Sequence, residues 1–478
     1  MSIAEYDEFD AIDIAAHVKS GELGAREVVE EAISRTEAVN PTLNFLAHEA
    51  FDVALTSADD PNLPDGPLKG VPWLVKELAM AWEGQPLTNC LPYLKDLRAP
   101  LDSVVMKRIK SAGMIPFGKS TAPEQGWSLA TESQLHGITR NPWNVTLTPG
   151  GSSGGSAAAV SARVLPMSDA SDGGGSIRVP AANCGLVGLK ASRGRIPLAP
   201  LVSDFWYGGA CFHCVSKSVR DTAMLLDITS GPLPGDPYQI GQPEHSFLSE
   251  VSRDPGQLRI AIVTEMACAR APINPEIKQA VVTAGSLLED LGHAVEPQLV
   301  PFSFEPLSDA YMAIVAVSTA AFLDDMAALV GRPATPADMA NLYWTMVEKG
   351  RSFTGIDHLN HIEALRTMSR AIATTMSQFD AWLMPTTPML PRTHGYYDMS
   401  LDVDTYNHER MGPDASFVMP FNAVGLPAIS VPMSWSADAL PIGVQLVGRD
   451  CDEATLLRLV GQIERARPWR DRKPPVCS

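Results

Sequence analysis

Two glycine- and serine-rich segments hold the residues of this 478-residue sequence that are best suited to chemistry. TPGGSSGGS spans residues 148–156 and SDGGGSIR spans residues 171–178. Clustered glycines let backbone N–H groups approach a reacting atom closely, and N–H groups aimed at a developing negative oxygen form an oxyanion hole. Composition alone also fits a flexible linker, but apolar residues border each segment. We therefore expect both segments inside the fold, with a serine beside the glycines as a candidate nucleophile.

A serine nucleophile needs a base, because its hydroxyl is a weak nucleophile at neutral pH. His136 and His213 are the nearest histidines in the sequence, and the sequence excludes neither. Lys76 is another candidate, since it follows the apolar run GVPWLV (70–75), which would carry its amine into the interior. Desolvation there favours the neutral amine. The residues alone leave these candidates open.

A third stretch, GMIPFGKS (113–120), has the G-x-x-x-x-G-K-S pattern of a phosphate-binding loop and raises the alternative of a nucleotide-binding protein. Pro116 removes one of the backbone donors that such a loop needs. The preceding residues, 103–113, are spaced as a helix, whereas a phosphate loop follows a strand. We predict a helix, a glycine cap and a short strand here, and no phosphate bound by Lys119.

Two other clusters have features of metal sites. Cys211 and Cys214 form C-F-H-C, but the sequence has no second C-x-x-C to complete a zinc site. His358 and His361, with Glu363, lie three residues apart rather than at the i, i+4 spacing of zinc-binding helices. We interpret the histidines as a polar helix face, and we expect neither a metal nor a cofactor.

The elements that must position these residues are those of an α/β protein. Residues 258–264 predict a buried strand, 276–291 a helix and 293–300 a second strand, which together form a βαβ unit. We predict one large domain over residues 1–478, with a central mixed, mainly parallel twisted β-sheet covered by helices on both faces. Other predicted elements are an opening helix over 25–40 that stops at Asn40-Pro41, strands over 428–433 and 442–448, and a helix over 452–465.

Composition and charge restrict the partners. The formal net charge of −18 disfavours nucleic acid and anionic membranes. The longest near-apolar segment, residues 312–323, is about 12 residues long, short of the roughly 20 that a membrane span needs. An acidic N-terminus without an export signal and an odd, scattered set of seven cysteines predict a reducing, cytoplasmic location. We expect a small-molecule substrate, with no nucleic acid and no membrane, and a monomer or homodimer.

A set of motifs in this chain resembles those of the amidase signature family. Within that family, the motifs are most similar to those of the branch of 6-aminohexanoate cyclic-dimer hydrolases and aryl acylamidases. The motifs are GVPWLVKE (70–77), AGMIPFGKSTAPEQG (112–126), RNPWN (140–144), TPGGSSGGSAAAV (148–160), SDGGGSIRVPAANCGLVGLKASRGRIP (171–197), FNAVGLPAISVPM (421–433) and LPIGVQLVG (440–448). The resemblance divides the predicted domain into an N-terminal helical segment (1–60), a signature core (61–200), a variable substrate-pocket region (301–420) and a C-terminal core (421–478).

The resemblance implies a catalytic triad of two serines and a lysine. Ser176 matches the nucleophile, Ser152 matches a bridging serine that follows a cis peptide bond, and Lys76 matches the base. The implied chemistry is hydrolysis of carbon–nitrogen bonds through an acyl-enzyme, without a metal. The implied oxyanion-hole residues are Gly173, Gly174 and Gly175, and the implied supporting residues are Ser153, Asp172 and Arg178.

The resemblance leaves the substrate open. The branch implies non-peptide amides, aryl or alkyl, with carbamates (urethanes) and nylon-type oligomers as related candidates. The alternative is the A subunit of an amidotransferase, although this chain has Gly173 and Val179 where glutamine-using members favour Thr and Gln. A binding protein without chemistry is another alternative. We expect the walls of the substrate pocket within residues 301–420 and around Phe205, Trp206 and Tyr207.

Overall fold

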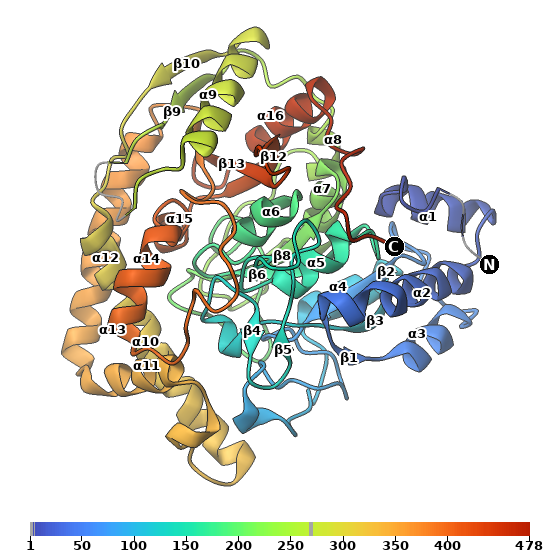
Figure 1. Ribbon diagram of the computed structural model, residues 1–478, viewed down its shortest axis with the longest axis horizontal. Coiled ribbons are helices and arrows are strands. Elements are labelled where there is room, and N and C mark those ends of the chain that lie inside the picture. Colours follow the sequence, from blue (N-terminus) through green and yellow to red (C-terminus); the bar gives the residue numbers. More distant parts are fainter. Residues whose placement is uncertain (1–2, 4, 267–270) are drawn as a thin grey trace.

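A hairpin of two apolar strands lies at the centre of the largest sheet. β12 (Ala428–Trp435) and β13 (Pro441–Gly448) pair antiparallel, and almost all of their side chains are buried. Branched side chains such as Val431 and Val444 suit this pleated, buried setting. The computed structural model describes residues 3, 5–266 and 271–478 (Figure 1).

An eight-stranded sheet is built around this hairpin in the order β10-β9-β11-β13-β12-β7-β8-β6. The pairs β10–β9 and β9–β11 are parallel, and the other neighbours in the described sheet are antiparallel. The predicted mixed sheet is therefore confirmed, but the expectation that it is mainly parallel is wrong, because five of the seven neighbouring pairs in the described sheet are antiparallel. The other strands are β6 (Met167–Asp172), β7 (Val187–Lys190), β8 (Cys211–Ser216), β9 (Arg259–Ile262), β10 (Ala294–Pro297) and β11 (Ala381–Pro385).

Lys76 lies outside this sheet, at the end of a strand in a separate three-stranded sheet. β3 (Ile115–Ser120) is its middle strand, antiparallel to β1 (Leu46–Glu49) and parallel to β2 (Pro72–Lys76). The predicted helix and short strand around GMIPFGKS are confirmed as α4 (Val104–Ser111) and β3. A third, two-stranded sheet joins β4 (Glu132–Ser133) and β5 (Gly137–Ile138).

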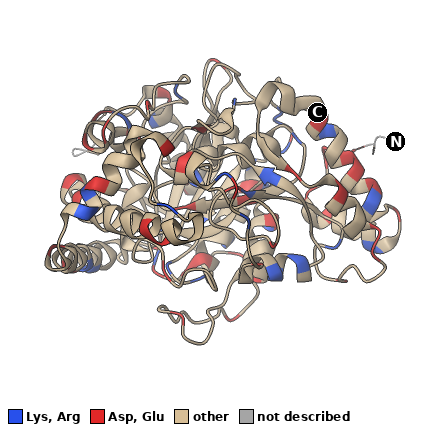
Figure 2. Cartoon of the chain, turned by 90° about the horizontal axis from the view of Figure 1, so that it is seen from below, with Lys and Arg blue, Asp and Glu red and all other residues tan. Residues whose placement is uncertain are grey.

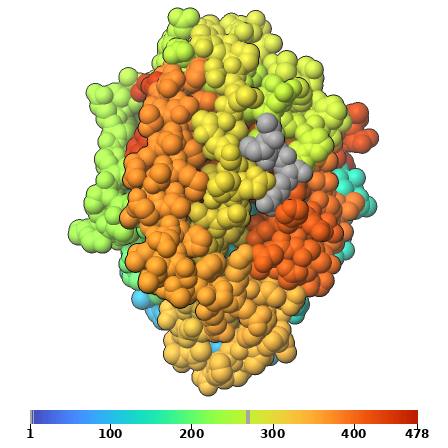
Figure 3. Space-filling model, turned by 90° about the vertical axis from the view of Figure 1, so that its left-hand side faces the viewer, coloured from blue at the N-terminus to red at the C-terminus, as the bar shows by residue number. Residues whose placement is uncertain are grey.

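Helices cover both faces of the large sheet, as predicted (Figure 1). Along β13, Ile442, Val444 and Leu446 belong to one apolar cluster with α9 and α16, whereas Val447 belongs to another with α10. Figure 3 shows the outer surface of this second side, where α10, α11 and α12 lie next to one another. The helices bordering the site are α5 (Gly154–Ser161), α6 (Arg178–Cys184), α10 (Phe304–Val330), α14 (Gly412–Ala415) and α15 (Met419–Val424).

The other helices complete the chain. They are α1 (Ala11–Ser20), α2 (Ala25–Leu43), α3 (Phe51–Ala58), α7 (Val219–Thr229), α8 (Phe247–Glu250), α9 (Pro275–Asp290), α11 (Asn341–Ser352), α12 (Gly355–Met376), α13 (Val403–Tyr406) and α16 (Glu453–Ala466). Short turns of 3₁₀ helix are η1 (Pro92–Leu94), η2 (Glu124–Gly126) and η3 (Pro336–Asp338), and a π-helical turn is η4 (Asn407–Met411).

Two details of the N-terminal helices differ from the sequence prediction. The opening helix is α1, which begins after a reciprocal cap between Asp10 and Asp13. The next helix, α2, does not stop at Asn40-Pro41 but ends at Leu43. Pro41 thus lies in the last turn of α2, and the Asn40 side chain accepts hydrogen bonds from the N–H groups of Phe45 and Leu46, just beyond the helix end.

The near-apolar segment at residues 312–323 is part of a longer helix than the sequence indicated. α10 has 27 residues, and by length and composition it could cross a membrane. It packs against α11, α12 and α15, with Tyr311, Ile314 and Val315 buried, which is the pattern of a core helix. Basic and acidic residues are interspersed along the outer helices (Figure 2). The partners, oligomeric state and cytoplasmic location that the sequence predicts stay predictions.

Lys119 forms a structural ion pair. Its amine lies 2.5 Å from a carboxylate oxygen of Glu77, and both side chains are buried. The amine also donates to the Pro86 carbonyl, and Glu77 accepts hydrogen bonds from the N–H and hydroxyl of Thr88. The lysine of the GKS motif therefore holds the loop that follows β2 against β3 in the interior.

Replacing Lys119 with methionine should destabilise the protein strongly, because the Glu77 carboxylate would stay buried without its counterion. We expect the free energy of unfolding to fall by about 3–5 kcal/mol, measured by urea denaturation. Lys69→Met removes a lysine from the more exposed pair with Asp65 and should cost less than about 1 kcal/mol. Equal effects of the two substitutions would contradict the structural role of Lys119.

Candidate active site

The Lys76 side chain is completely buried and surrounded by serine hydroxyls. Its amine lies 2.7 Å from Ser152 Oγ, 2.8 Å from Ser153 Oγ and 2.9 Å from Ser171 Oγ. β2 is buried along its whole length, so the strand carries its last residue into the interior. The structure therefore brings Lys76 together with Ser152 and Ser153, as the sequence predicts.

Burial controls the charge of this amine. Removal from water lowers the pKa of Lys76 to about 7, against the opposing negative charges of Asp169 and Asp172. The backbone N–H of Lys76 donates to Asp169 Oδ2 at 2.9 Å. A lysine with this pKa is neutral in a large fraction of molecules at neutral pH and can accept a proton.

The segment that carries Ser152 is tightly packed. The peptide bond between Gly151 and Ser152 is cis, as the resemblance implied. A Cβ atom at Gly151 would lie 2.3 Å from the Ser128 carbonyl oxygen, so only glycine fits there. The Ser153 N–H donates to the Ser176 carbonyl at 3.2 Å, which joins the two glycine-rich segments. The expectation that these segments are part of the fold is therefore confirmed.

Asp172 shapes the loop that carries Ser176. One oxygen of its carboxylate accepts from the N–H of Gly175 at 2.7 Å, and the other accepts from the N–H of Ile177 at 3.2 Å. This changes the expectation for the oxyanion hole, because the Gly175 N–H already points at Asp172. The N–H groups of Gly173, Gly174 and Ser176 have no hydrogen-bond partner among the described residues.

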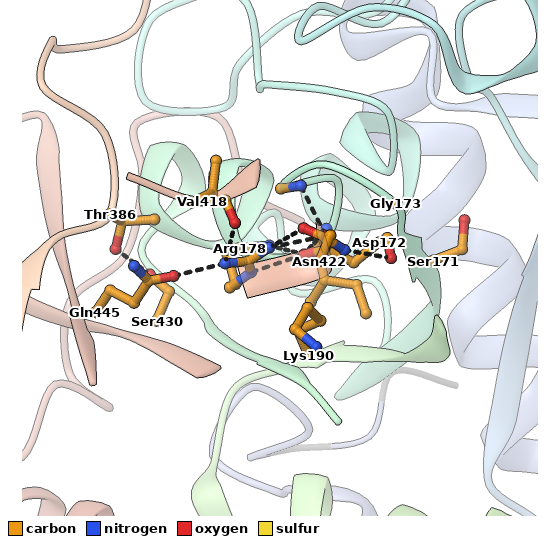
Figure 4. A network of polar contacts seen from close by, with 12 residues as sticks. Ser171, Asp172, Gly173, Arg178, Lys190, Thr386, Val418, Asn422, Ser430 and Gln445 are labelled. Carbon is orange, nitrogen blue, oxygen red and sulfur yellow. Dashed lines mark hydrogen bonds and ion pairs between the residues drawn. The ribbon is translucent and has the colours of Figure 1, made fainter. Parts of the chain in front are cut away.

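Arg178 holds Asp172 in place (Figure 4). Both side chains are fully buried, and the guanidinium bonds both carboxylate oxygens, at 2.9 and 3.0 Å. Burial alone would raise the pKa of Asp172, but the charge and hydrogen bonds of Arg178, with a hydrogen bond from Asn422, hold it well below its ordinary value. Asp172 is therefore a permanent carboxylate at neutral pH.

Two amide side chains complete this network and were not recognised from the sequence. Asn422 accepts from Arg178 at 2.6 Å and donates to the Asp172 carboxylate at 2.9 Å. Gln445 accepts from Arg178 at 2.7 Å and donates to the Phe417 carbonyl. Gln445 could have been found from the sequence, because it lies in the middle of the apolar strand IGVQLVG. A buried amide in such a strand needs hydrogen-bond partners, which indicates a polar network.

Ser176 faces a narrow cavity of about 40 Å³ that is mostly apolar. Of the predicted pocket residues, Trp206 lines it, whereas Phe205 and Tyr207 do not. α10 supplies part of the predicted wall, but the loop after η2 was not anticipated. The lining residues are Gly126, Trp127, Ser128, Leu129, Gly173, Gly174, Ser176, Trp206, Tyr311, Met312, Val315, Met411, Ala415 and Met419.

Trp206 closes one side of this cavity. Its ring packs at a tilt of 48° against Trp127, with 5.4 Å between centroids, and a Cβ atom at Gly173 would lie 2.2 Å from it. Trp206 and Tyr207 both have a left-handed backbone, with φ near 57°, which large side chains rarely adopt. The Tyr207 ring contacts the guanidinium groups of Arg193 and Arg366, and these contacts hold the turn in place.

The histidines and cysteines considered from the sequence lie elsewhere. His213 is buried in β8, and His136 packs edge-on against His48 near the β4–β5 hairpin. Burial lowers the pKa of both His136 and His213 to about 4. Cys211 and Cys214 are an odd number of residues apart on β8 and face opposite sides of the strand. Within the described residues, no group of three His, Cys, Asp or Glu side chains is placed to hold a metal.

Comparisons with known proteins agree with this geometry. A family model described as amidase matches residues 27–457. The protein belongs to the amidase signature family. This amidase is 35% identical to the 6-aminohexanoate-cyclic-dimer hydrolase of Paenarthrobacter ureafaciens, over 98% of this chain and 97% of that one. It is 32% identical to an acylamidase of Rhodococcus erythropolis, over 97% and 96% of the two chains.

A solved structure of 6-aminohexanoate cyclic dimer hydrolase complexed with substrate has the same fold, with a TM-score of 0.94, 34% identity and coverage of 100% of both chains. The predicted family and branch are confirmed, and so is the single α/β domain with a large mixed sheet. This amidase is an amide-hydrolysing enzyme, which sets aside a nucleotide-binding protein and a binding protein without chemistry.

The Asp172–Arg178 pair should make stability depend on pH. The folded-state pKa of Asp172 lies below its unfolded value of about 3.9. Its contribution is therefore present above pH 4 and is lost as the pH falls toward the folded value. The difference in unfolding free energy between wild type and Asp172→Asn should shrink by about 1 kcal/mol from pH 6 to pH 3.

Urea denaturation at a series of pH values measures this difference. Asp65→Asn, at an exposed residue, serves as the matched control and should show no such trend. A difference between wild type and Asp172→Asn that stays constant over this range would contradict the depressed pKa.

Proposed function

We propose that this amidase hydrolyses small non-peptide amides, with Ser176 as nucleophile, Ser152 as proton bridge and Lys76 as base. The observation that carries the proposal is the 2.7 Å contact between the buried Lys76 amine and Ser152 Oγ. A neutral amine has two N–H groups and one lone pair, so it can donate to two of its three serine neighbours and accept a proton from the third.

The reaction begins with proton transfer from Ser152 to Lys76. Ser152 takes the proton of Ser176 as the Ser176 oxygen attacks the amide carbon and forms the new carbon–oxygen bond. The negative charge on the carbonyl oxygen is stabilised by the N–H groups of Gly173, Gly174 and Ser176. Gly174 suits this role because the space beside it is open, the nearest atom to an added Cβ being 3.9 Å away.

The acyl-enzyme forms when the carbon–nitrogen bond breaks. Lys76 returns its proton through Ser152 to the leaving nitrogen, which departs as an amine. Water then attacks the ester of Ser176, its proton passes along the same relay, and release of the acid regenerates the Ser176 hydroxyl. Asp172 and Arg178 hold the loop throughout, and Ser153 helps to position the Lys76 amine.

The cavity indicates the class of substrate. None of the described lining residues is charged, and the walls beside Ser176 are mainly Trp, Met, Val and Leu side chains. Such walls suit an uncharged aryl or alkyl group. The names of the relatives, a cyclic-dimer hydrolase and an acylamidase, support amides of this kind. Carbamates and nylon-type oligomers present the same carbonyl and belong to the proposed class.

Release of 4-nitroaniline from acyl-4-nitroanilides at pH 8, by the purified chain alone, tests the proposal. Ser176→Ala and Lys76→Ala should each lower kcat by about 10⁴ or more, because members of such a triad act as a unit. Ser57→Ala, at a half-buried residue of α3 that does not line the cavity, should retain wild-type activity.

Two outcomes would contradict the proposal. Turnover that survives Lys76→Ala would rule out the lysine relay. Activity that appears only with ATP and added partner subunits would instead favour the alternative of an amidotransferase A subunit. A 4-nitrophenylcarbamate ester in the same panel shows whether carbamates are cleaved.

Trp206 should limit the size of the acyl group. We expect Trp206→Ala to raise kcat/KM for a bulky acyl-4-nitroanilide, relative to the acetyl compound, by about tenfold or more, because hydrophobic pockets discriminate by this order. Phe205→Ala is the matched control, since Phe205 packs on Trp206 at 5.2 Å but does not line the cavity. An unchanged ratio in Trp206→Ala would mean that other walls set the limit.

A further inference from the structure

β6 contacts Lys76 at two places. Asp169 and Ser171 are two residues apart on this strand, so their side chains point to the same face. Ser171 Oγ lies 2.9 Å from the Lys76 amine, and Asp169 Oδ2 accepts the Lys76 backbone N–H at 2.9 Å. The strand thus contacts the base at both its main chain and its side-chain end, although Lys76 belongs to a different sheet.

The other oxygen of Asp169 is unusual. Asp169 is 1% exposed, and its Oδ1 is buried without a hydrogen-bond partner among the described residues. A buried polar oxygen normally has a partner, and a lone buried carboxylate is costly. No acid was recognised at this position from the sequence, and the mechanism above assigns it no step.

We propose that Asp169 is a positioning residue for the base, one that fixes the Lys76 main chain and sets through its own charge how readily the amine holds a proton. This inference rests on the proposed role of Lys76. When Asp169 is a carboxylate, it stabilises the Lys76 ammonium. When Asp169 is a neutral acid, that stabilisation is lost and the amine releases its proton more readily.

The balance of charges in this cluster supports the inference. Burial raises the pKa of Asp169 to about 7, against the Lys76 N–H and the charges of Lys76 and Lys119. Because the pKa of Lys76 is also about 7, the two groups titrate together, and their protonation steps belong to the pair.

Asp172, the two nearby thiols and His213 keep one charge state near neutral pH, whereas burial lowers the pKa of Lys190, a neighbour of Asp172 on β7, to about 8. Arg178 keeps Asp172 ionised, and Lys119 is paired with Glu77. Burial raises the pKa of the thiols of Cys90, in the loop after β2, and Cys214, opposite Asp169 on β8, so both stay neutral. Burial also lowers the pKa of His213 to about 4, so this neighbour on β8 stays neutral.

The test compares wild type with Asp169→Asn, which keeps an oxygen acceptor for the Lys76 N–H but removes the charge. The first readout is the rate at which an alkyl fluorophosphonate labels Ser176, in which the serine oxygen bonds phosphorus and fluoride leaves. The second readout is kcat/KM for an acyl-4-nitroanilide. Both are measured from pH 5 to pH 9.

We expect the acidic limb of both profiles to move to lower pH by about one unit in Asp169→Asn, because loss of a nearby negative charge favours the neutral amine. Asp221→Asn is the matched control. Asp221 is a second buried acid, which accepts the backbone N–H groups of Ala11 and Ile12, and its replacement should leave the limb in place.

A lower plateau with an unmoved acidic limb would assign Asp169 a structural role and overturn the inference. Asp169→Ser removes the same charge with a smaller side chain and must show the same displacement if Asp169→Asn does not fold. Failure of the probe to label Ser176 in folded wild type would instead count against the proposed function, so the two failures are distinguishable.

Discussion

The site depends on the burial of one amine without a counterion in direct contact. Three serine hydroxyls surround Lys76, and within the described residues no carboxylate forms an ion pair with it. The hydroxyls can hydrogen-bond to the amine, but they carry no charge to balance a buried ammonium. Burial therefore favours the neutral form of the amine. Two of the hydroxyls come from the segment after the cis peptide bond and one comes from β6. The contacts that surround the Lys76 amine therefore also hold these two segments next to β2.

Asp172, a buried acid on β6, differs from Lys76 because it has a counterion in direct contact. Asp172 follows Ser171 directly on β6, so the two side chains point to opposite faces of the strand. One face meets the Lys76 amine, and the other meets the Arg178 guanidinium with an amide on each side (Figure 4). A single strand therefore separates the proposed base from a carboxylate that stays charged at neutral pH.

The sequence predicted the local surroundings of the site residues correctly. The apolar run before Lys76 predicted a buried amine, and the glycines around Ser152 and Ser176 predicted tight packing. Pairing was harder to predict, since the direction of a strand depends on its distant neighbours, and the sheet is less parallel than expected. Asn422 and Asp169 escaped notice because their partners lie far away in the sequence, at residues 178 and 76.

The division of the proposed triad between two sheets has a consequence for heat inactivation. Lys76 ends a strand of the small sheet, whereas β6, at the edge of the large sheet, leads into the loop of Ser176. Where β2 and β6 meet, the Ser168 hydroxyl donates to the Leu74 carbonyl, and the Lys76 backbone N–H donates to the Asp169 carboxylate. A shift of one sheet against the other would separate Lys76 from the loop of Ser176 while both sheets stay intact. Under the proposed relay, such a shift would abolish activity on warming before the domain unfolds.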